Sequence, residues 1–191
     1  ISKAVPIALA VVFGFCAVAM IGIMVYFSCI DTKTDLGSFE RIIRFNDIWG
    51  THRGFMWIRS IWIFGDASFI EKLFGVGPDM FYSAFSPYFD DLSKYGDSST
   101  NAAHNEYLNY LITIGITGLL SYLAIVCGTI KNAVKYAKEN PMLIACVSAV
   151  ICYAVQAVVN LYQPITTPLF FIFIALCEAF VRNAKAEKSA V

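Results

Sequence analysis

The residues best suited to chemistry lie in a polar segment, residues 31–106, between long apolar runs. In it, His104 precedes Asn105 and Glu106 at the expected start of an apolar helix. Unpaired backbone N–H groups and the positive end of the helix dipole meet at such a start, which favours an anion such as a diphosphate. An imidazole there titrates near neutral pH and can accept a proton. The alternative is an interfacial side chain hydrogen-bonded to water. The second histidine, His52, we interpret as a solvent-exposed neighbour.

Four of the five arginines lie in the same segment, and two of them are suited to binding a phosphate group. The planar guanidinium of arginine matches phosphate oxygens two at a time and keeps its charge. On a helix, Arg53 and Trp57 are four residues apart and share one face, whereas Arg59 lies on another face. The alternative for both arginines is contact with anionic lipid headgroups or ion pairing with an acidic neighbour: Asp47, Asp66 or Glu71. The other two, Arg41 and Arg44, we interpret as interfacial anchors.

A glycine turn, some acidic residues and the cysteines carry weaker signals. Gly75-Val76-Gly77-Pro78 predicts a turn, and the missing third glycine and the lack of a preceding strand pattern favour a structural turn over a phosphate cradle. The acidic residues Asp90, Asp91 and Asp97 lack the spacing of a calcium loop, so we interpret them as solvated. The six cysteines form no Cys-x-x-Cys pair, so we predict neither a disulfide framework nor a metal site.

The composition of the chain indicates that the helices flanking this polar segment lie in a membrane. The 191 residues are 58% hydrophobic and 15% charged, whereas soluble domains carry about 25% charged residues. We predict an all-α integral membrane protein, a single membrane domain with about four transmembrane helices over residues 4–30, 104–130, 142–161 and 166–182. The last two share an uncharged run of 37 residues. As one helix it would measure about 55 Å against a hydrocarbon core of about 30 Å, so it must break near Asn160–Pro164 or at Pro168.

Charge bias predicts which side of the membrane each region faces. Basic residues precede the first span, fill the loop 131–138 and follow residue 181, and the positive-inside rule places these regions in the cytoplasm. Residues 31–103 then form a large extracytoplasmic loop. Because the chain begins with Ile1, we expect a fragment of a longer polytopic protein.

The extracytoplasmic segment contains all three tryptophans, as expected for elements at a membrane interface. We expect interfacial helices near 38–49 and 54–64, and a short helix over 79–85. Residues 86–101 have the composition of a loop and are long enough to act as a lid. Thr100 or Asn101 is the expected N-cap of the following helix. A small soluble domain packed on itself is the alternative for this segment.

Four short motifs in this chain resemble the O-antigen ligase and O-antigen polymerase family over roughly residues 50–125. In chain order they are Arg53-x-x-x-Trp57, Leu73-Phe-Gly-Val-Gly-Pro78-x-x-Phe81, Ala103-His-Asn-Glu-Tyr-Leu108 and Ile114-Gly-Ile-Thr-Gly-Leu119. The resemblance implies a polytopic glycosyltransferase of the GT-C type. It would work at the outer face of the bacterial cytoplasmic membrane on glycans carried by undecaprenyl diphosphate.

The resemblance also implies roles for individual residues. A histidine in the position of His104 is catalytic, and an arginine in the position of Arg53 binds the diphosphate, with no metal or other cofactor. We add Arg59 as a second diphosphate ligand and four supporting residues: Trp57, Gly75, Gly77 and Asn105. Family members use a further arginine in an earlier outer loop, which has no counterpart in this chain.

The predicted function is polymerisation or ligation of undecaprenyl-diphosphate-linked glycan in bacterial surface polysaccharide biosynthesis, with polymerisation slightly preferred. The expected partners are the lipid-linked donor, a glycan or lipid acceptor and membrane lipid, and not nucleic acid. The alternatives are a transporter-like protein that guides an anionic lipid-linked substrate, and a non-catalytic scaffold. A transporter would carry polar residues at mid-depth in its spans, whereas here Gln156 and Asn160 lie toward a helix end. A scaffold would tolerate loss of His104 and Arg53.

Overall fold

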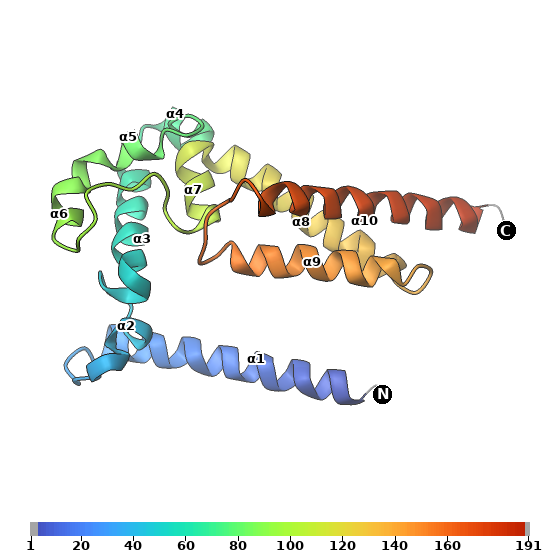
Figure 1. Ribbon diagram of the computed structural model, residues 1–191, viewed down its shortest axis with the longest axis horizontal. Helices are drawn as coiled ribbons and strands as arrows, with labels where there is room; N and C mark the ends of the chain where they lie inside the picture. Colours follow the sequence, from blue (N-terminus) through green and yellow to red (C-terminus); the bar gives the residue numbers. More distant parts are fainter. Residues whose placement is uncertain (1–3, 190–191) are drawn as a thin grey trace. The chain divides into compact units, whose positions relative to one another are not determined.

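The computed structural model describes residues 4–189, with side chains for residues 11, 12 and 14–189. Regular structure in this range is entirely helical, which confirms the predicted all-α class (Figure 1). The chain folds as two compact units, the first ending at Ile58 and the second beginning at Arg59.

The first unit begins with a long apolar helix, α1 (Ala4–Val25), which continues into a π-helical turn, Tyr26–Ile30. The backbone N–H of Asp31 donates to the Tyr26 carbonyl at 2.9 Å and ends the turn. Helical structure therefore covers the predicted range 4–30. The side chains of Phe15 and Val18 are 74% and 70% exposed, so α1 presents an apolar surface that the described residues leave uncovered. Such a surface is compatible with contact to lipid.

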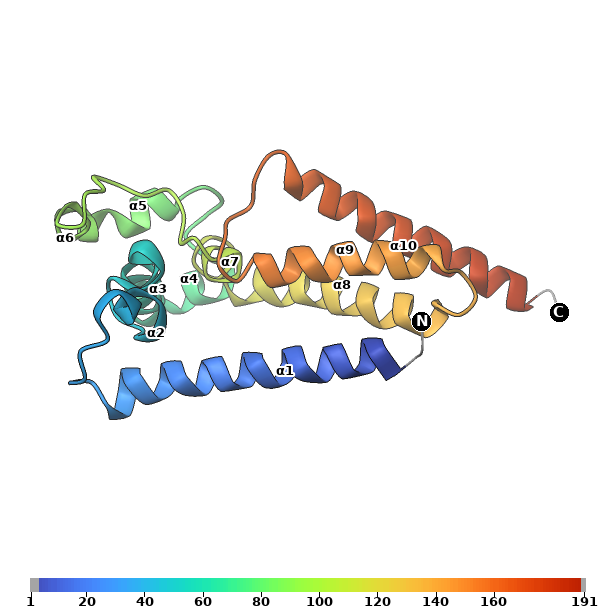
Figure 2. The same cartoon turned by 60° about the horizontal axis from the view of Figure 1, so that its bottom comes forward.

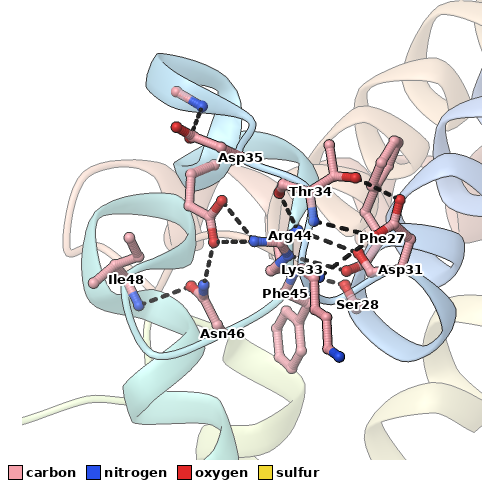
Figure 3. Close-up of polar contacts among 12 residues, drawn as sticks. Phe27, Ser28, Asp31, Lys33, Thr34, Asp35, Arg44, Phe45, Asn46 and Ile48 are labelled. Carbon is pink, nitrogen blue, oxygen red and sulfur yellow. Dashed lines mark hydrogen bonds and ion pairs between the residues drawn. The ribbon is translucent and has the colours of Figure 1, made fainter.

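A network of hydrogen bonds centred on Arg44, called the clasp below, joins the end of this helix to the residues that follow (Figure 3). The Arg44 guanidinium donates to the backbone carbonyls of Phe27 (3.0 Å), Asp31 (3.2 Å) and Thr34 (2.7 Å), and its Nη1 lies 2.8 Å from both carboxylate oxygens of Glu40. The Arg44 side chain is only 13% exposed. Protein carbonyls and a carboxylate therefore take up the donors of Arg44, a structural role that its interpretation as an interfacial anchor did not include.

The expected helix near 38–49 forms only in part, over residues 38–43 and again from Trp49. The structure has a 3₁₀ turn, Gly37–Phe39, followed by the single turn of α2 (Glu40–Ile43). Helical structure stops because Arg44 adopts an extended conformation, with ψ of 116°, to reach its carbonyl partners. Asn46 then donates from its side-chain amide to the Glu40 carboxylate at 3.1 Å, which ties the chain after α2 to the same clasp.

Helix α3 (Trp49–Asp66) is longer than the predicted helix 54–64 and begins with a kink. The kink is Gly50–His52, whose φ angles lie between 58° and 67°, in the left-handed region. Gly54 follows at a close approach of two backbones, because a Cβ on it would overlap the carbonyl group of Asn46. The clasp and this contact together fix where the regular part of α3 starts.

The second unit begins with the last part of α3, from Arg59, and continues with three short helices: α4 (Phe69–Phe74), α5 (Phe81–Phe85) and α6 (Phe89–Ser93). Ser68 and Glu71 form a capping box at the start of α4. The expected helix over 79–85 starts late, because Asp79 has φ of 59°, outside the helical region. The expectation of a loop over 86–101 is also wrong in part, since α6 lies inside it and buries Leu92 completely.

The predicted helix through Tyr107–Ile130 is broken in two. Helix α7 (Glu106–Thr113) and helix α8 (Gly115–Tyr136) are separated at Ile114, where φ is −124°. Gly115 has φ of 69°, and a Cβ there would overlap the Leu73 carbonyl. The break therefore has a tertiary cause, because the chain at Leu73 occupies the space that a side chain would need. Asn105, not Thr100 or Asn101, is the N-cap of α7.

Helices α8, α9 (Met142–Gln156) and α10 (Thr166–Ser189) lie side by side in both views (Figures 1 and 2). Two clusters of buried side chains hold them together, one around Leu143 and Cys177 and one around Tyr122 and Phe170. The predicted break in the long uncharged run is confirmed, since no regular helix covers 157–165. Cys146 and Cys177 are buried free thiols in this core.

Among the described residues, α8 is the one helix long and apolar enough to cross a membrane. Its 22 residues would span about 33 Å, slightly more than a hydrocarbon core. Helix α9 is apolar and shorter, and so are residues 14–30, the continuous part of the first helical stretch for which side chains are described. The structure thus supports a membrane-crossing helix and leaves the count of four spans as a prediction.

Candidate functional site

His104 lies immediately before the N-cap of α7, not in the first turn of the helix as expected. Its backbone is left-handed, with φ of 50°, and its side chain is partly buried. On one side, the buried N–H of Ala103 donates to the Asn109 side-chain oxygen at 3.3 Å. On the other side, Asn105 is 7% exposed, and its side-chain oxygen accepts the Leu108 N–H at 3.0 Å. His104 is therefore held between two fixed backbone positions.

The start of α7 offers fewer open N–H groups than expected. The Glu106 N–H donates to the Ala157 carbonyl at 2.9 Å, and the Leu108 N–H is capped by Asn105. The Tyr107 hydroxyl also donates to the Ala154 carbonyl at 2.7 Å. These contacts place the start of α7 against the last turn of α9, whose terminal carbonyls would otherwise lack donors. The Glu106 and Leu108 amides are therefore not free to bind an anion, and an anion here would depend more on the imidazole.

The Glu106 carboxylate is the buried polar centre of the unit, with the residue only 1% exposed. Its Oε2 accepts the Tyr153 hydroxyl at 2.9 Å, and that hydroxyl lies 2.8 Å from Thr167 Oγ1. The three residues come from α7, α9 and α10, so this network ties the element next to His104 to the helical bundle. Glu106 Oε1 has no hydrogen-bond donor of good geometry among the described residues.

The glycine turn lies at the opposite end of α7 from His104. The Val76 and Gly77 N–H groups donate to the Ile112 and Thr113 carbonyls at 2.9 and 3.0 Å, and the Gly75 N–H donates to Glu71. Gly75 has φ of 78°, and a Cβ on it would overlap the Thr113 carbonyl. With these three amides bonded to carbonyls, the turn closes the end of α7 and is not a phosphate cradle. The eight residues of α7 separate it from His104 by about 12 Å.

Arg53 and Trp57 lie in the first unit, on one face of α3 as predicted. Arg53 Nη1 donates to the Gly50 carbonyl at 2.7 Å, inside the left-handed kink. Trp57 packs against Phe45 and Trp49, with ring centroids 6.1 and 5.1 Å apart. Arg53 Nε and Trp57 Nε1 are buried donors that find no acceptor among the described residues. A buried N–H without an acceptor costs about 1–3 kcal/mol, and an anionic ligand at this face would remove that cost.

Arg59 has different surroundings in the second unit. Its guanidinium carbon lies 4.7 Å from the centroid of the Trp62 ring, a cation–π contact. The hydrogen bond and charge of Lys94 lower the pKa of the Asp91 carboxyl. The charge of Arg59 lowers the same pKa to a smaller extent. Asp91, which was not among the acidic neighbours considered from the sequence, is therefore one acidic residue on which the charge of Arg59 acts.

Two residues of the buried network were not found from the sequence. Tyr153 and Thr167 appear there as ordinary members of apolar helices, and their link to Glu106 spans 47 and 61 positions. The sequence carried one signal for this network: Glu106 is the only charged residue between 104 and 130. No group of three or more His, Cys, Asp or Glu side chains suited to a metal occurs among the described residues.

Residues 3–123 match the protein family described as O-antigen ligase. No curated protein and no solved structure matches the chain. The match covers most of the chain and includes Arg53, Arg59 and His104. The chain therefore belongs to the O-antigen ligase family.

Proposed function

We propose that this chain carries out glycosyl transfer from undecaprenyl diphosphate during synthesis of a bacterial surface polysaccharide. Family membership supports a role in surface-glycan biosynthesis at the bacterial inner membrane. The observation that carries the proposal is the match over residues 3–123, which encloses His104 and Arg53 together with the helices that hold them. Within the family we prefer polymerisation, in which the acceptor is another glycan, over ligation to a lipid.

The proposed reaction is a displacement at the anomeric carbon of the donor sugar. A hydroxyl oxygen of the acceptor forms a new bond to C1, and the bond from C1 to the diphosphate oxygen breaks. The electron pair of that bond leaves with the diphosphate, whose negative charge grows, and the acceptor hydroxyl loses its proton. The protein must therefore bind an anion that gains charge and provide a path for one proton.

Arg53 and Trp57 are the proposed donors for the diphosphate. Their buried Nε and Nε1 atoms share a helix face and have no acceptor within the described chain. Diphosphate oxygens would provide acceptors for both, and the charge of Arg53 would favour the developing anion most when the C1–O bond breaks. Arg59 is proposed as a second cation for the same group, balanced in the free protein by Asp91.

Two roles are proposed for His104, and a pH profile separates them. As a general base it must be neutral, so kcat rises with pH as the imidazole loses its proton. As a cationic contact to the diphosphate it must be protonated, so kcat falls over the same range. The measurement is transfer from a lipid-linked donor in proteoliposomes between about pH 5 and 8, with His104→Ala as the baseline.

We also propose that the chain crosses the inner membrane four times, with residues 31–103 outside. The apolar helices α1, α8, α9 and α10 support this topology, as does the concentration of basic residues at 131–138 and 182–188. Cysteine labelling from outside intact cells tests it. A cysteine introduced at Asp97 should react, and one at Lys138 should react only after the cells are opened.

Complementation of a strain lacking the full-length gene tests the function. His104→Ala and Arg53→Ala should each abolish long-chain glycan while protein level holds. His52→Ala is a matched control for His104→Ala, because both histidines are partly buried with φ of 67° and 50°, and it should retain long glycan. Wild-type chain lengths in both His104→Ala and Arg53→Ala would overturn the enzymatic proposal and leave the scaffold alternative.

A further inference from the structure

A hollow of about 180 Å³ opens in the second unit between the turn after Gly77, α7 and the start of α10. It lies apart from His104 and is lined by groups that the proposed reaction does not use. Six of its lining residues are Asp79, Asn109, Tyr110, Ile114, Tyr162 and Thr167. A water molecule fills about 30 Å³ of liquid, so the hollow has room for about six waters or for a solute of that bulk.

Two of the residues that line the hollow, 83 positions apart in the sequence, are joined by a hydrogen bond. The Tyr162 hydroxyl donates to Asp79 Oδ1 at 3.0 Å. Burial, and then this hydrogen bond, raise the pKa of Tyr162, so its hydroxyl stays a neutral donor at physiological pH. Asp79 is exposed, and its Oδ2 accepts no hydrogen bond from the described residues. A carboxylate oxygen at the rim is thus available to a ligand hydroxyl.

Asp79 is also in a conformation that non-glycine residues adopt rarely, with φ of 59°. The helix that follows could have started at this residue, as its sequence predicts, and instead begins at Phe81. Conformations of this kind cost about 1–3 kcal/mol and are found mostly where function requires them. The turn therefore holds the carboxylate at the hollow at some expense in local stability.

The opposite wall is fixed by the buried polar network. Thr167 lines the hollow and shares its Oγ1 with the Tyr153 hydroxyl and with the Gln163 N–H, at 2.8 and 3.0 Å. Asn109, 4% exposed, lines it too and accepts the N–H of Ala103, the residue before His104. The hollow and His104 are therefore built on the same helix, α7, and on the same network.

We infer that this hollow binds one neutral sugar ring of the glycan substrate. The inference rests on the proposed function and deepens it by naming a sugar subsite and its charge preference. A sugar ring needs hydrogen-bond partners for its hydroxyls and apolar or aromatic surface for its C–H faces, and this wall provides a carboxylate, an amide and two tyrosines. An isoprenoid chain would leave those polar groups without partners. A ring with its own carboxylate would meet the charge of Asp79, so hexuronates are disfavoured.

The test is saturation-transfer NMR on the full-length protein in a zwitterionic detergent without a sugar headgroup. The probes are methyl glucoside, methyl N-acetylglucosaminide and methyl glucuronide. We expect binding of the two neutral glycosides and about tenfold weaker binding of the glucuronide. Asp79→Asn should bring the glucuronide to within about twofold of the neutral probes, because the like charge is gone. Tyr162→Phe should weaken all three.

Two controls match these variants. Asp97→Asn removes an exposed carboxylate from the same polar segment, and Tyr82→Phe removes an exposed hydroxyl; both should bind as wild type. Asp79→Asn keeps an oxygen that accepts the Tyr162 hydrogen bond, so the fold should persist. The subsite is refuted if no glycoside binds, if Asp79→Asn and Tyr162→Phe match their controls, or if geranylgeraniol displaces the sugar probes completely at equimolar concentration.

His104→Ala separates this inference from the proposed function. It should bind the neutral glycosides with unchanged affinity while transferring no glycan. If His104→Ala retained transfer, the proposed catalytic role of His104 would fail, and the ratio of the affinities for neutral and acidic probes would still test the subsite.

Discussion

Replacing Gly115 with alanine is expected to loosen the junction between α4, the glycine turn and α8. A Cβ at Gly115 would overlap the Leu73 carbonyl and lie 2.6 Å from the Gly75 nitrogen. Both neighbours are backbone, so neither can rotate away as a side chain would. The left-handed φ of 69° adds a further penalty of about 1–2 kcal/mol for an L-residue.

Moving the turn away from α8 must weaken three hydrogen bonds. They are Val76 N–H to Ile112 O, Gly77 N–H to Thr113 O, and Thr117 Oγ1 to Leu73 O. At about 0.5–1.5 kcal/mol each, their loss and the backbone penalty together give about 3–6 kcal/mol. For a chain of this length, about 2–4 °C of melting temperature corresponds to 1 kcal/mol, so the midpoint should fall by at least about 6 °C.

Gly128→Ala is the matched control, because Gly128 lies in the same helix and a Cβ there meets nothing within 4 Å. Alanine is favoured over glycine inside a helix by about 0.5–1 kcal/mol, so this variant should melt no lower than wild type. The assay is thermal unfolding of both variants in the same detergent, followed by tryptophan fluorescence. Midpoints for Gly115→Ala and Gly128→Ala within about 2 °C of each other would refute the claim that these backbones are in rigid contact.

Three further changes test other parts of the fold and the site. Arg44→Lys should lower the melting midpoint, because one ammonium cannot reach three carbonyls and a carboxylate together, whereas Arg41→Lys, at an exposed position, should not. Tyr153→Phe should destabilise the folded protein by about 1–3 kcal/mol in the same melting assay, because it leaves the Glu106 carboxylate buried with one donor fewer. The same variant should slow glycan synthesis. Unchanged stability would show that the network is dispensable. Arg53→Lys should reduce transfer from the lipid-linked donor by about tenfold or more, since a point charge does not replace the planar fork, and full activity would indicate a purely electrostatic role.

The sequence predicted those features that depend on local composition. Uncharged runs predicted the helical class, and prolines near residues 164 and 168 predicted the break between α9 and α10. Spacing of four residues predicted that Arg53 and Trp57 share a face of α3. The glycine turn at residues 75–78 was also visible, because its signal is the residue types themselves.

Features that depend on distant contacts were missed. The break at Ile114 arises because Leu73 approaches Gly115. Gly115 is visible in the sequence as a mark of close contact or local irregularity, whereas its neighbour Leu73 is not. In the sequence, Arg44 has the features of an interfacial anchor. Only the folded chain shows that the carbonyls of Phe27 and Thr34 lie at its guanidinium. The interactions of Glu106 with α9 and α10 likewise exist only in the folded unit.

The central proposal is that Arg53 and His104 both serve the same transfer reaction, and a double-mutant cycle tests it most directly. Transfer rates from the lipid-linked donor would be measured for Arg53→Ala, His104→Ala and the double variant. Each single change should slow transfer by on the order of 10²-fold or more. Residues that stabilise the same transition state are not additive, so the double variant should be little slower than the slower single variant. A double variant slowed by the full product of the two single effects would contradict the claim.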